Sequence, residues 1–334
     1  MARLLRRSKT TMDRANIDAS TPVVGRNDLE ALHAAVACKV VDPREGIFGP
    51  RSISWRINRE AALFLGAGRA ALLQLAHPWV AVALKQHSSL MSNPIARFHN
   101  TFRIVFTMIF GSSAQAFAAS RSLYQLHTRI RGELPSAVAG YAQGSHYETN
   151  TIPALIWVYA TLMESAVLAY ECVLPPLTDA EREKFYAESR VLAALFGIPS
   201  EALPANWVSF KTYVEETCAS SALGVDMLSR SMAHKILSGA GSWIHPPRWY
   251  RALTTAWLPV RFREEFELPF GSEEERTVDL ARRRLPAIYR RLPGSLRFVG
   301  PYQQAKARLK GRSPGLLTRA SNRFWIGDSL LPFG

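Results

Sequence analysis

The chain has 334 residues, 48% of them hydrophobic, and a formal net charge of +14. This apolar content is sufficient for a large hydrophobic core, in one large domain or in two poorly separated ones. The sequence contains no Walker loop, no G-x-G-x-x-G fingerprint and no G-x-S-x-G elbow. These absences argue against nucleotide-driven chemistry and against a serine hydrolase.

The sequence offers no signal for export or for a membrane span. The basic start of the chain, MARLLRRSKTTMDRAN, is not followed by the apolar stretch of a signal peptide. The most apolar regions, near residues 60–84 and 151–174, are interrupted by charged side chains before they reach the roughly 20 residues that cross a bilayer. We therefore expect a cytoplasmic protein whose three cysteines are reduced.

The predicted elements are almost entirely helical. Residues 1–26 are polar and are expected to form a flexible N-terminal segment, and a first helix is predicted from Asn27 to about Lys39. Further helices are predicted over 54–65, from 78, and over 94–108, 113–131, 151–173, 179–196, 205–218, 222–238, 247–257 and 273–290. Gly66 and Gly68 break the pattern after the second helix, and residues 132–150 are predicted to be a polar loop. Because no period-2 strand pattern appears, the fold class is all-α, with a single domain of about ten or more helices over residues 27–290.

Two neighbouring helices carry the most informative side chains. On 94–108 one face is polar at its start and apolar further along, and consists of Arg97, Asn100, Thr101, Ile104, Val105 and Met108. On 113–131 the face that ends at His127 consists of Ala116, Ala119, Ser120 and Leu123. Small side chains leave space beside a helix, and an imidazole at the end of that space can ligate the metal of a flat cofactor. From periodicity alone, a hydrogen-bonded core histidine is the commoner explanation.

Blocks of sequence in a fixed order resemble the family of latex-clearing proteins and MpaB-type oxygenases. The blocks are residues 66–88, NPIARFHNT at 93–101, LHTRIRG at 126–132, WVYATLMES at 157–165, FGIPSEALP at 196–204 and FKTYVEE at 210–216. The resemblance covers roughly residues 50–260. It implies a helical protein that holds haem b in a buried pocket, for which a globin-like core is one arrangement. The better-known members cleave a carbon–carbon double bond of an isoprenoid chain with dioxygen.

The resemblance also implies roles for the residues on the two faces. His127 matches the proximal haem ligand, with Ala116, Ala119, Ser120 and Leu123 beside the cofactor. Arg97 and Thr101 match the residues of the distal side, where they would stabilise negative charge that develops on oxygen. The rubber-cleaving members have a lysine where this chain has Asn100. A carboxamide is a poor iron ligand, so we expect an open distal position and a discrete lipid-like substrate. The haem would be held noncovalently, because the chain has no CxxCH motif.

Glu164 interrupts the otherwise apolar helix over 151–173. A buried carboxylate is costly unless it is paired, and a salt bridge to a core arginine such as Arg69 is the simplest explanation. The alternative is that Glu164 orients His127, because a ligating imidazole usually donates its other N–H to a carboxylate or carbonyl.

Positive charge is concentrated near the C-terminus. Twelve basic residues and no acidic residue lie between Arg282 and Arg323, and residues 291–334 form a basic C-terminal segment. A solvated basic helix explains this pattern, and attachment to an anionic membrane surface is the sharper interpretation. Nucleic acid is not expected as a partner, because no recognition motif accompanies the charge.

Two functions follow from these observations. The first is a haem b-dependent oxygenase that cleaves a carbon–carbon double bond of an apolar, isoprenoid or lipid-like substrate with dioxygen, although hydroxylation or peroxide-driven oxidation is also compatible with the residues. The alternative is a haem- or lipid-binding helical protein without turnover, attached to membranes by its basic C-terminal segment.

Overall fold

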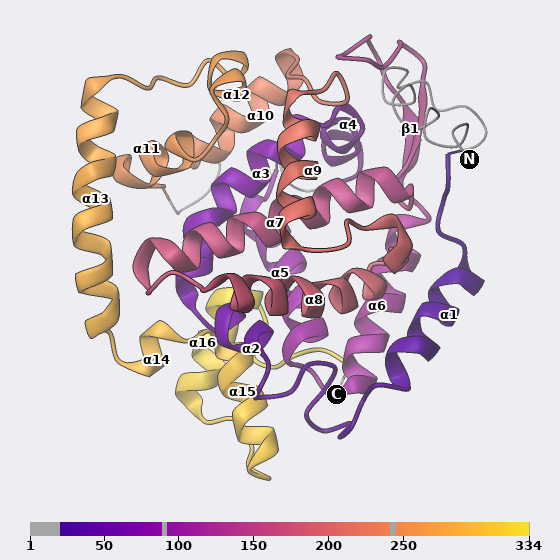
Figure 1. The fold of residues 1–334 in the computed structure, drawn as a ribbon, viewed down its shortest axis with the longest axis vertical. Helices are drawn as coiled ribbons and strands as arrows, with labels where there is room; N and C mark the ends of the chain where they lie inside the picture. Colours follow the sequence, from indigo (N-terminus) through magenta and orange to yellow (C-terminus); the bar gives the residue numbers. More distant parts are fainter. Residues whose placement is uncertain (1–20, 89–91, 241–244, 334) are drawn as a thin grey trace, which may run out of the picture.

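The computed structural model describes residues 21–88, 92–240 and 245–333 (Figure 1). The α-helices in these residues are α1 (Arg26–Ala37), α2 (Ile53–Asn58), α3 (Ala67–Leu75), α4 (Pro78–His87), α5 (Pro94–Phe110), α6 (Ser113–His127), α7 (Ile152–Val173), α8 (Asp179–Leu195), α9 (Trp207–Ala219), α10 (Met227–Ser238), α11 (Arg248–Ala256), α12 (Val260–Glu265), α13 (Ser272–Arg291), α14 (Gly294–Arg297), α15 (Gly300–Leu309) and α16 (Leu316–Ile326). Two 3₁₀ helices, η1 (Ala61–Gly66) and η3 (Ser200–Ala202), and an antiparallel pair of strands, β1 (Arg131–Glu133) and β2 (His146–Glu148), complete the set. The all-α prediction is confirmed.

Helix α7 runs through the centre of the molecule, with α8 beneath it and α13 and α1 at opposite edges (Figure 1). Most of its side chains are buried, as the prediction of a central helix over 151–173 required. Among the described residues it is the one helix long and apolar enough to cross a bilayer, but most of that apolar stretch is buried in the core. Trp157 fixes α7 against α3 by donating its indole N–H to the carbonyl of Leu73 at 2.9 Å.

The carboxylate of Glu164, directly and through Arg69, ties three parts of the chain to α7. Arg69 on α3 donates to Glu164 Oε2 at 2.5 Å, and Lys211 on α9 donates to Oε1. Arg69 also donates to Ser165 Oγ and to the carbonyl of Trp257, which follows α11, each at 2.9 Å. Burial alone would raise the pKa of Glu164, but the charges of Arg69 and Lys211 outweigh burial and hold that pKa below its usual range. The predicted salt bridge between Glu164 and Arg69 is confirmed.

Two glycines allow the N-terminal part of α3 to approach its neighbours. A Cβ on Gly66 would lie 2.5 Å from the carbonyl oxygen of Ser165, and a Cβ on Gly68 would lie 2.7 Å from Thr254 Oγ1. The prediction that these glycines break the helical pattern is therefore wrong, because the chain continues into α3 through both of them. The predicted helix over 54–65 is in turn divided into α2 and the 3₁₀ helix η1.

The C-terminal segment packs against the helical domain. The indole of Trp325 on α16 stacks on Phe64 of η1, with ring centroids 4.1 Å apart and ring planes 9° apart. On α5, His99 Nε2 lies 3.0 Å from the carbonyl of Phe324, and Arg103 Nε donates to the carbonyl of Ile326 at 3.2 Å. Residues 316–326 therefore cover one side of α5.

Other boundaries differ locally from the prediction. Helix α6 ends at His127 rather than at 131, and the loop predicted over 132–150 contains most of the β1–β2 hairpin. The N-terminal segment predicted to be flexible falls largely on residues 1–20, which lie outside the described residues. Val24, in its last part, is buried and donates its N–H to the carbonyl of Asn150 at 2.9 Å.

We expect the substitution Glu164→Gln to lower the free energy of unfolding by about 3–5 kcal/mol, because it leaves the buried guanidinium of Arg69 without a counter-charge. The matched control is Glu215→Gln. Glu215 is exposed and lies 4.0 Å from the same Lys211, so its loss should change stability by less than about 1 kcal/mol. Urea unfolding measures both values, and equal effects of the two variants would contradict the role assigned to Glu164.

Candidate functional site

Helices α5 and α6 form a hairpin that brings Arg97 and His127 to the same end. Pro94 begins α5, with Asn93 accepting the N–H of Ala96 at 3.0 Å, and Ser112 caps the start of α6. The two helices are joined by only Gly111 and Ser112 and pack together, which makes them antiparallel neighbours. Arg97, near the start of α5, therefore lies beside the end of α6.

His127 is held as a neutral imidazole. Burial lowers its pKa to about 4, the positive charge of Arg97 lowers it further, and a hydrogen bond with the side chain of Asn150 opposes these effects. The amide of Asn150 donates to the carbonyl of Tyr124 at 3.5 Å, which leaves its oxygen to accept the N–H of His127. One ring nitrogen is thus occupied, and the other is an unprotonated nitrogen of the kind that ligates metals.

Arg97 carries a positive charge without a counter-charge. Burial lowers the pKa of its guanidinium, and among the described residues no carboxylate lies within ion-pair distance of it. A half-buried cation without a carboxylate partner favours an anion or a developing negative charge beside it. Its influence on His127 shows that the two side chains share one region of the hairpin.

The two other polar residues predicted on this face of α5 differ in position. The hydroxyl of Thr101 donates to the carbonyl of Arg97 at 3.0 Å, so its proton is already used within the helix. Asn100 is exposed, and its oxygen accepts a hydrogen bond from Arg103 at 3.1 Å. The structure therefore keeps Thr101 with Arg97 but places Asn100 toward solvent, where its amide bonds to the guanidinium of the half-buried Arg103.

The small residues of α6 do not leave free space. Ala116 and Ala119 are fully buried in the core, and the hydroxyl of Ser120 donates to the carbonyl of Leu195 at 2.5 Å and lies 2.7 Å from Nε2 of His33. Helices α1 and α8 thus occupy the region beside these residues. The prediction of an open stripe is wrong at these three positions, and Leu123 is half-buried at the edge of the core.

Asn150 replaces Glu164 as the partner of His127. Both oxygens of Glu164 are used by Arg69 and Lys211, so the alternative in which Glu164 orients His127 is wrong. Asn150 is buried at the end of the loop before α7. In the sequence, Asn150 is a polar residue directly before a very apolar predicted helix. A residue in such a position is more often a helix cap than a partner of a histidine.

The open end of the α5–α6 hairpin is incompletely covered by protein. All of the last five residues of α5 are buried, whereas none of residues 94–105 is. On α6, likewise, none of residues 121–127 is buried. Several of these partly covered side chains are large and apolar, including Phe98, Phe102 and Ile104. Phe98 and Phe102 pack on Phe64 of η1, whereas the half-buried neutral imidazole of His127 and the unpaired guanidinium of Arg97 are suited to a flat cofactor with anionic substituents.

A small apolar cavity of about 50 Å³ lies between α5, α7 and α8, next to Thr101. Its other lining side chains are mostly apolar: Leu63, Phe102, Val105, Phe106, Leu162, Met163, Ala166, Leu192 and Phe196. Of the three apolar residues on the predicted face of α5, Val105 lines this cavity, whereas Ile104 and Met108 do not. A ligand larger than a few atoms requires side chains such as Met163 and Phe102 to move.

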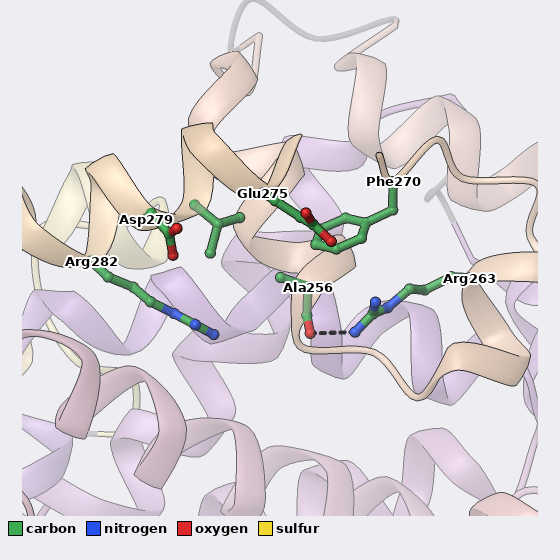
Figure 2. Close-up of a pocket in the computed structure, with 7 residues that line it drawn as sticks. Ala256, Arg263, Phe270, Glu275, Asp279 and Arg282 are labelled. Carbon is green, nitrogen blue, oxygen red and sulfur yellow. Dashed lines mark hydrogen bonds between the residues drawn. The ribbon is translucent and has the colours of Figure 1, made fainter. Parts of the chain in front are cut away.

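A larger cavity of about 250 Å³ lies elsewhere, between the segment after α11 and helix α13. Figure 2 shows Arg263 and Arg282 on opposite sides of this cavity, with Glu275 and Asp279 on α13. Arg263 is fixed by donating to the carbonyl of Ala256 at 2.8 Å. None of the residues of the α5–α6 site lines this cavity. Although it is the larger of the two, it is therefore not part of that site.

These features describe a helical protein in which a neutral histidine lies near an arginine that has no carboxylate partner among the described residues. Residues 55–291, more than two thirds of the chain, match the family described as "ER-bound oxygenase mpaB/B'/Rubber oxygenase, catalytic domain". The chain belongs to this family of oxygenases, and the resemblance seen in the sequence blocks is confirmed. No curated protein and no solved structure matches the chain.

The low pKa of His127 has a consequence for stability. In the unfolded chain histidine titrates near pH 6.5, so between that pH and about pH 4 the unfolded state binds more protons than the folded state. The free energy of unfolding should therefore fall as the pH decreases through this window. His127→Gln should make this fall shallower, and urea unfolding near pH 7 and near pH 5 measures it.

The matched control is His146→Gln, because His146 is exposed on β2 and pairs with the exposed Glu133, an interaction that contributes little to stability. The assignment of a half-buried, neutral His127 would be contradicted by identical pH dependence in the wild type and His127→Gln.

Proposed function

We propose that this protein is an oxygenase that binds one haem b noncovalently, with His127 as the protein ligand of the iron. We further propose that it oxidises an apolar, isoprenoid or lipid-like substrate. The observation that carries this proposal is the neutral imidazole of His127 beside the unpaired guanidinium of Arg97, at the incompletely covered end of α5 and α6. Haem b, when bound, supplies an iron that activates dioxygen for attack on a carbon–carbon double bond.

His127 and Asn150 act as a pair in this proposal. The oxygen of Asn150 accepts the N–H of one ring nitrogen, which fixes the tautomer and the plane of the ring. The other nitrogen then needs no deprotonation at neutral pH before it ligates iron. A carboxylate in place of Asn150 would make the ligand more basic, so the neutral amide gives a weaker donor ligand than a histidine–carboxylate pair.

Arg97 supplies the positive charge of the site. The guanidinium is half-buried and has no carboxylate partner among the described residues, so it is partly desolvated and can stabilise negative charge developing on reacting oxygen atoms without prior rearrangement. Thr101 contributes mainly through its shape, because its hydroxyl proton is held by the carbonyl of Arg97. The main polar contribution therefore comes from one residue of the predicted pair.

The substrate class follows from the lining beside Thr101. The cavity there is bounded by aliphatic and aromatic side chains of α5, α7 and α8, which favour a hydrocarbon chain and exclude water from the reacting bond. Asn100 offers no amine that would close the distal position, and its side chain lies toward solvent. An open position and a discrete substrate smaller than a polymer remain the expectation for this chain.

The ligand assignment is tested by His127→Ala. We expect the variant to lose most of its haem absorption in the Soret region while its circular dichroism stays helical, because the iron loses its protein ligand. His146→Ala on the exposed hairpin is the control and should retain the cofactor. An unchanged Soret band in His127→Ala would show that another residue holds the iron.

The roles of the distal pair are separated by comparing Arg97→Ala with Thr101→Val. Loss of the preorganised charge of Arg97 should reduce the rate by a factor of roughly 100 to 1000 with haem retained. Thr101→Val should reduce it by less than about tenfold, because the hydroxyl is already used within α5. Carbonyl products formed from short isoprenoids and dioxygen measure both rates. Equal losses in the two variants, or full activity in Arg97→Ala, would contradict this division of roles.

A further inference from the structure

The exposed side of α16 combines large apolar side chains with positive charge. Leu316 and Leu317, at its start, are 86% and 78% exposed, and Phe324 is also exposed. Arg319 and Arg323 lie on the same outward side. The opposite side is buried through Asn322, Ile326 and the stacked Trp325. The helix is thus fixed to the protein by one face and presents a basic, apolar face to its surroundings.

Neighbouring elements extend this face. The loop between α15 and α16 carries Lys310 and Arg312, both exposed, and Leu296 on α14 is exposed as well. Figure 1 shows α14, α15 and α16 together at the lower end of the molecule, near the end of α13. Arg290 and Arg291, in the last turn of α13, are also exposed. We call this surface, formed by the end of α13, by α14, by the 310–315 loop and by the outer side of α16, the basic apolar face.

Several basic side chains on this face form no ion pair or hydrogen bond with the described residues of the protein. Of the twelve basic residues between 282 and 323, Arg297 pairs with Glu60 at 2.7 Å and Arg308 donates to the carbonyl of Phe110 at 2.7 Å. By contrast, the side chains of Lys310, Arg312 and Arg323 have no hydrogen bond or ion pair among the described residues. The positive charge of these three side chains is therefore available to an anionic partner outside the chain.

We propose that the basic apolar face docks on the surface of an anionic lipid bilayer. Phospholipid headgroups supply the negative charge, and the boundary between headgroups and acyl chains takes up the exposed leucine and phenylalanine side chains. A nucleic acid would satisfy the arginines but would leave the aliphatic side chains in water, so it accounts for only half of this surface. Because α16 packs on α5, docking would also bring the bilayer to the helix that carries Arg97 and Thr101.

The test uses the full chain and sedimentation with vesicles of phosphatidylcholine, alone or mixed with phosphatidylserine. The wild type should bind the mixed vesicles, bind the neutral ones weakly, and be released by salt. The triple variant Lys310→Gln, Arg312→Gln, Arg323→Gln should bind on the order of 100-fold more weakly, at about fivefold per basic residue. Its control is Lys39→Gln, Lys85→Gln, Lys184→Gln, which removes three exposed charges elsewhere and should bind as the wild type does.

A second pair of variants tests the apolar contribution. Leu316→Ser with Leu317→Ser should weaken binding on the order of tenfold or more. Val208→Ser with Met227→Ser, which changes two side chains of similar exposure (73% and 83%) on α9 and α10, should have no effect. The proposal is overturned if the wild type does not bind the mixed vesicles, or if each variant binds like its control. It is also overturned if single-stranded RNA competes the protein off vesicles while the leucine variant binds as well as the wild type, because that outcome indicates a nucleic-acid surface.

Discussion

The buried carboxylate of Glu164 is the constraint around which the rest of the structure is arranged. A negative charge in the middle of an apolar helix is tolerated only if cations reach it, and here they come from α3 and α9. Arg69 in turn holds Ser165 and the chain after α11. This ionic centre thus links α3, α9 and the chain after α11 to α7, and Ser165, which accepts from Arg69, also lines the cavity beside Thr101. The packing that stabilises the fold is therefore continuous with the packing that shapes the candidate site.

The candidate site is built on a second constraint, the antiparallel pairing of α5 and α6. A two-residue connection brings the start of one helix and the end of the other together, so Arg97 and His127 meet at the open end of the hairpin. Their charges are compatible only because His127 is neutral, and the low pKa of His127 is caused by burial first and by Arg97 second. The same proximity that keeps the imidazole unprotonated leaves the guanidinium as the single positive charge of the site. A neutral His127 is suited to ligating a metal, and a charged Arg97 is suited to stabilising negative charge.

Much of this arrangement could be predicted from the sequence. The spacing of residues along α5, the uniform hydrophobicity of α7 and the pairing of Glu164 with Arg69 follow from periodicity and from the cost of burying charge. What could not be predicted depends on contacts between distant segments. The alanines of α6 indicate close packing as readily as free space, and only the arrival of His33 and Leu195 decides between the two. Asn150 is likewise indistinguishable from a helix cap until the loop before α7 folds back onto α6. The position of α16 against α5 rests on contacts of Phe64 and His99, which lie more than 200 residues earlier in the chain.

The central claim is that the open end of the α5–α6 hairpin holds one haem b. The most direct measurement is a titration of the purified full chain, freed of cofactor, with haemin, followed by absorbance in the Soret region. The account predicts a saturable change that ends at about one equivalent of haemin per chain, with a spectrum typical of histidine ligation. A linear, unsaturated increase, like that of haemin adsorbed nonspecifically to a protein surface, would contradict it.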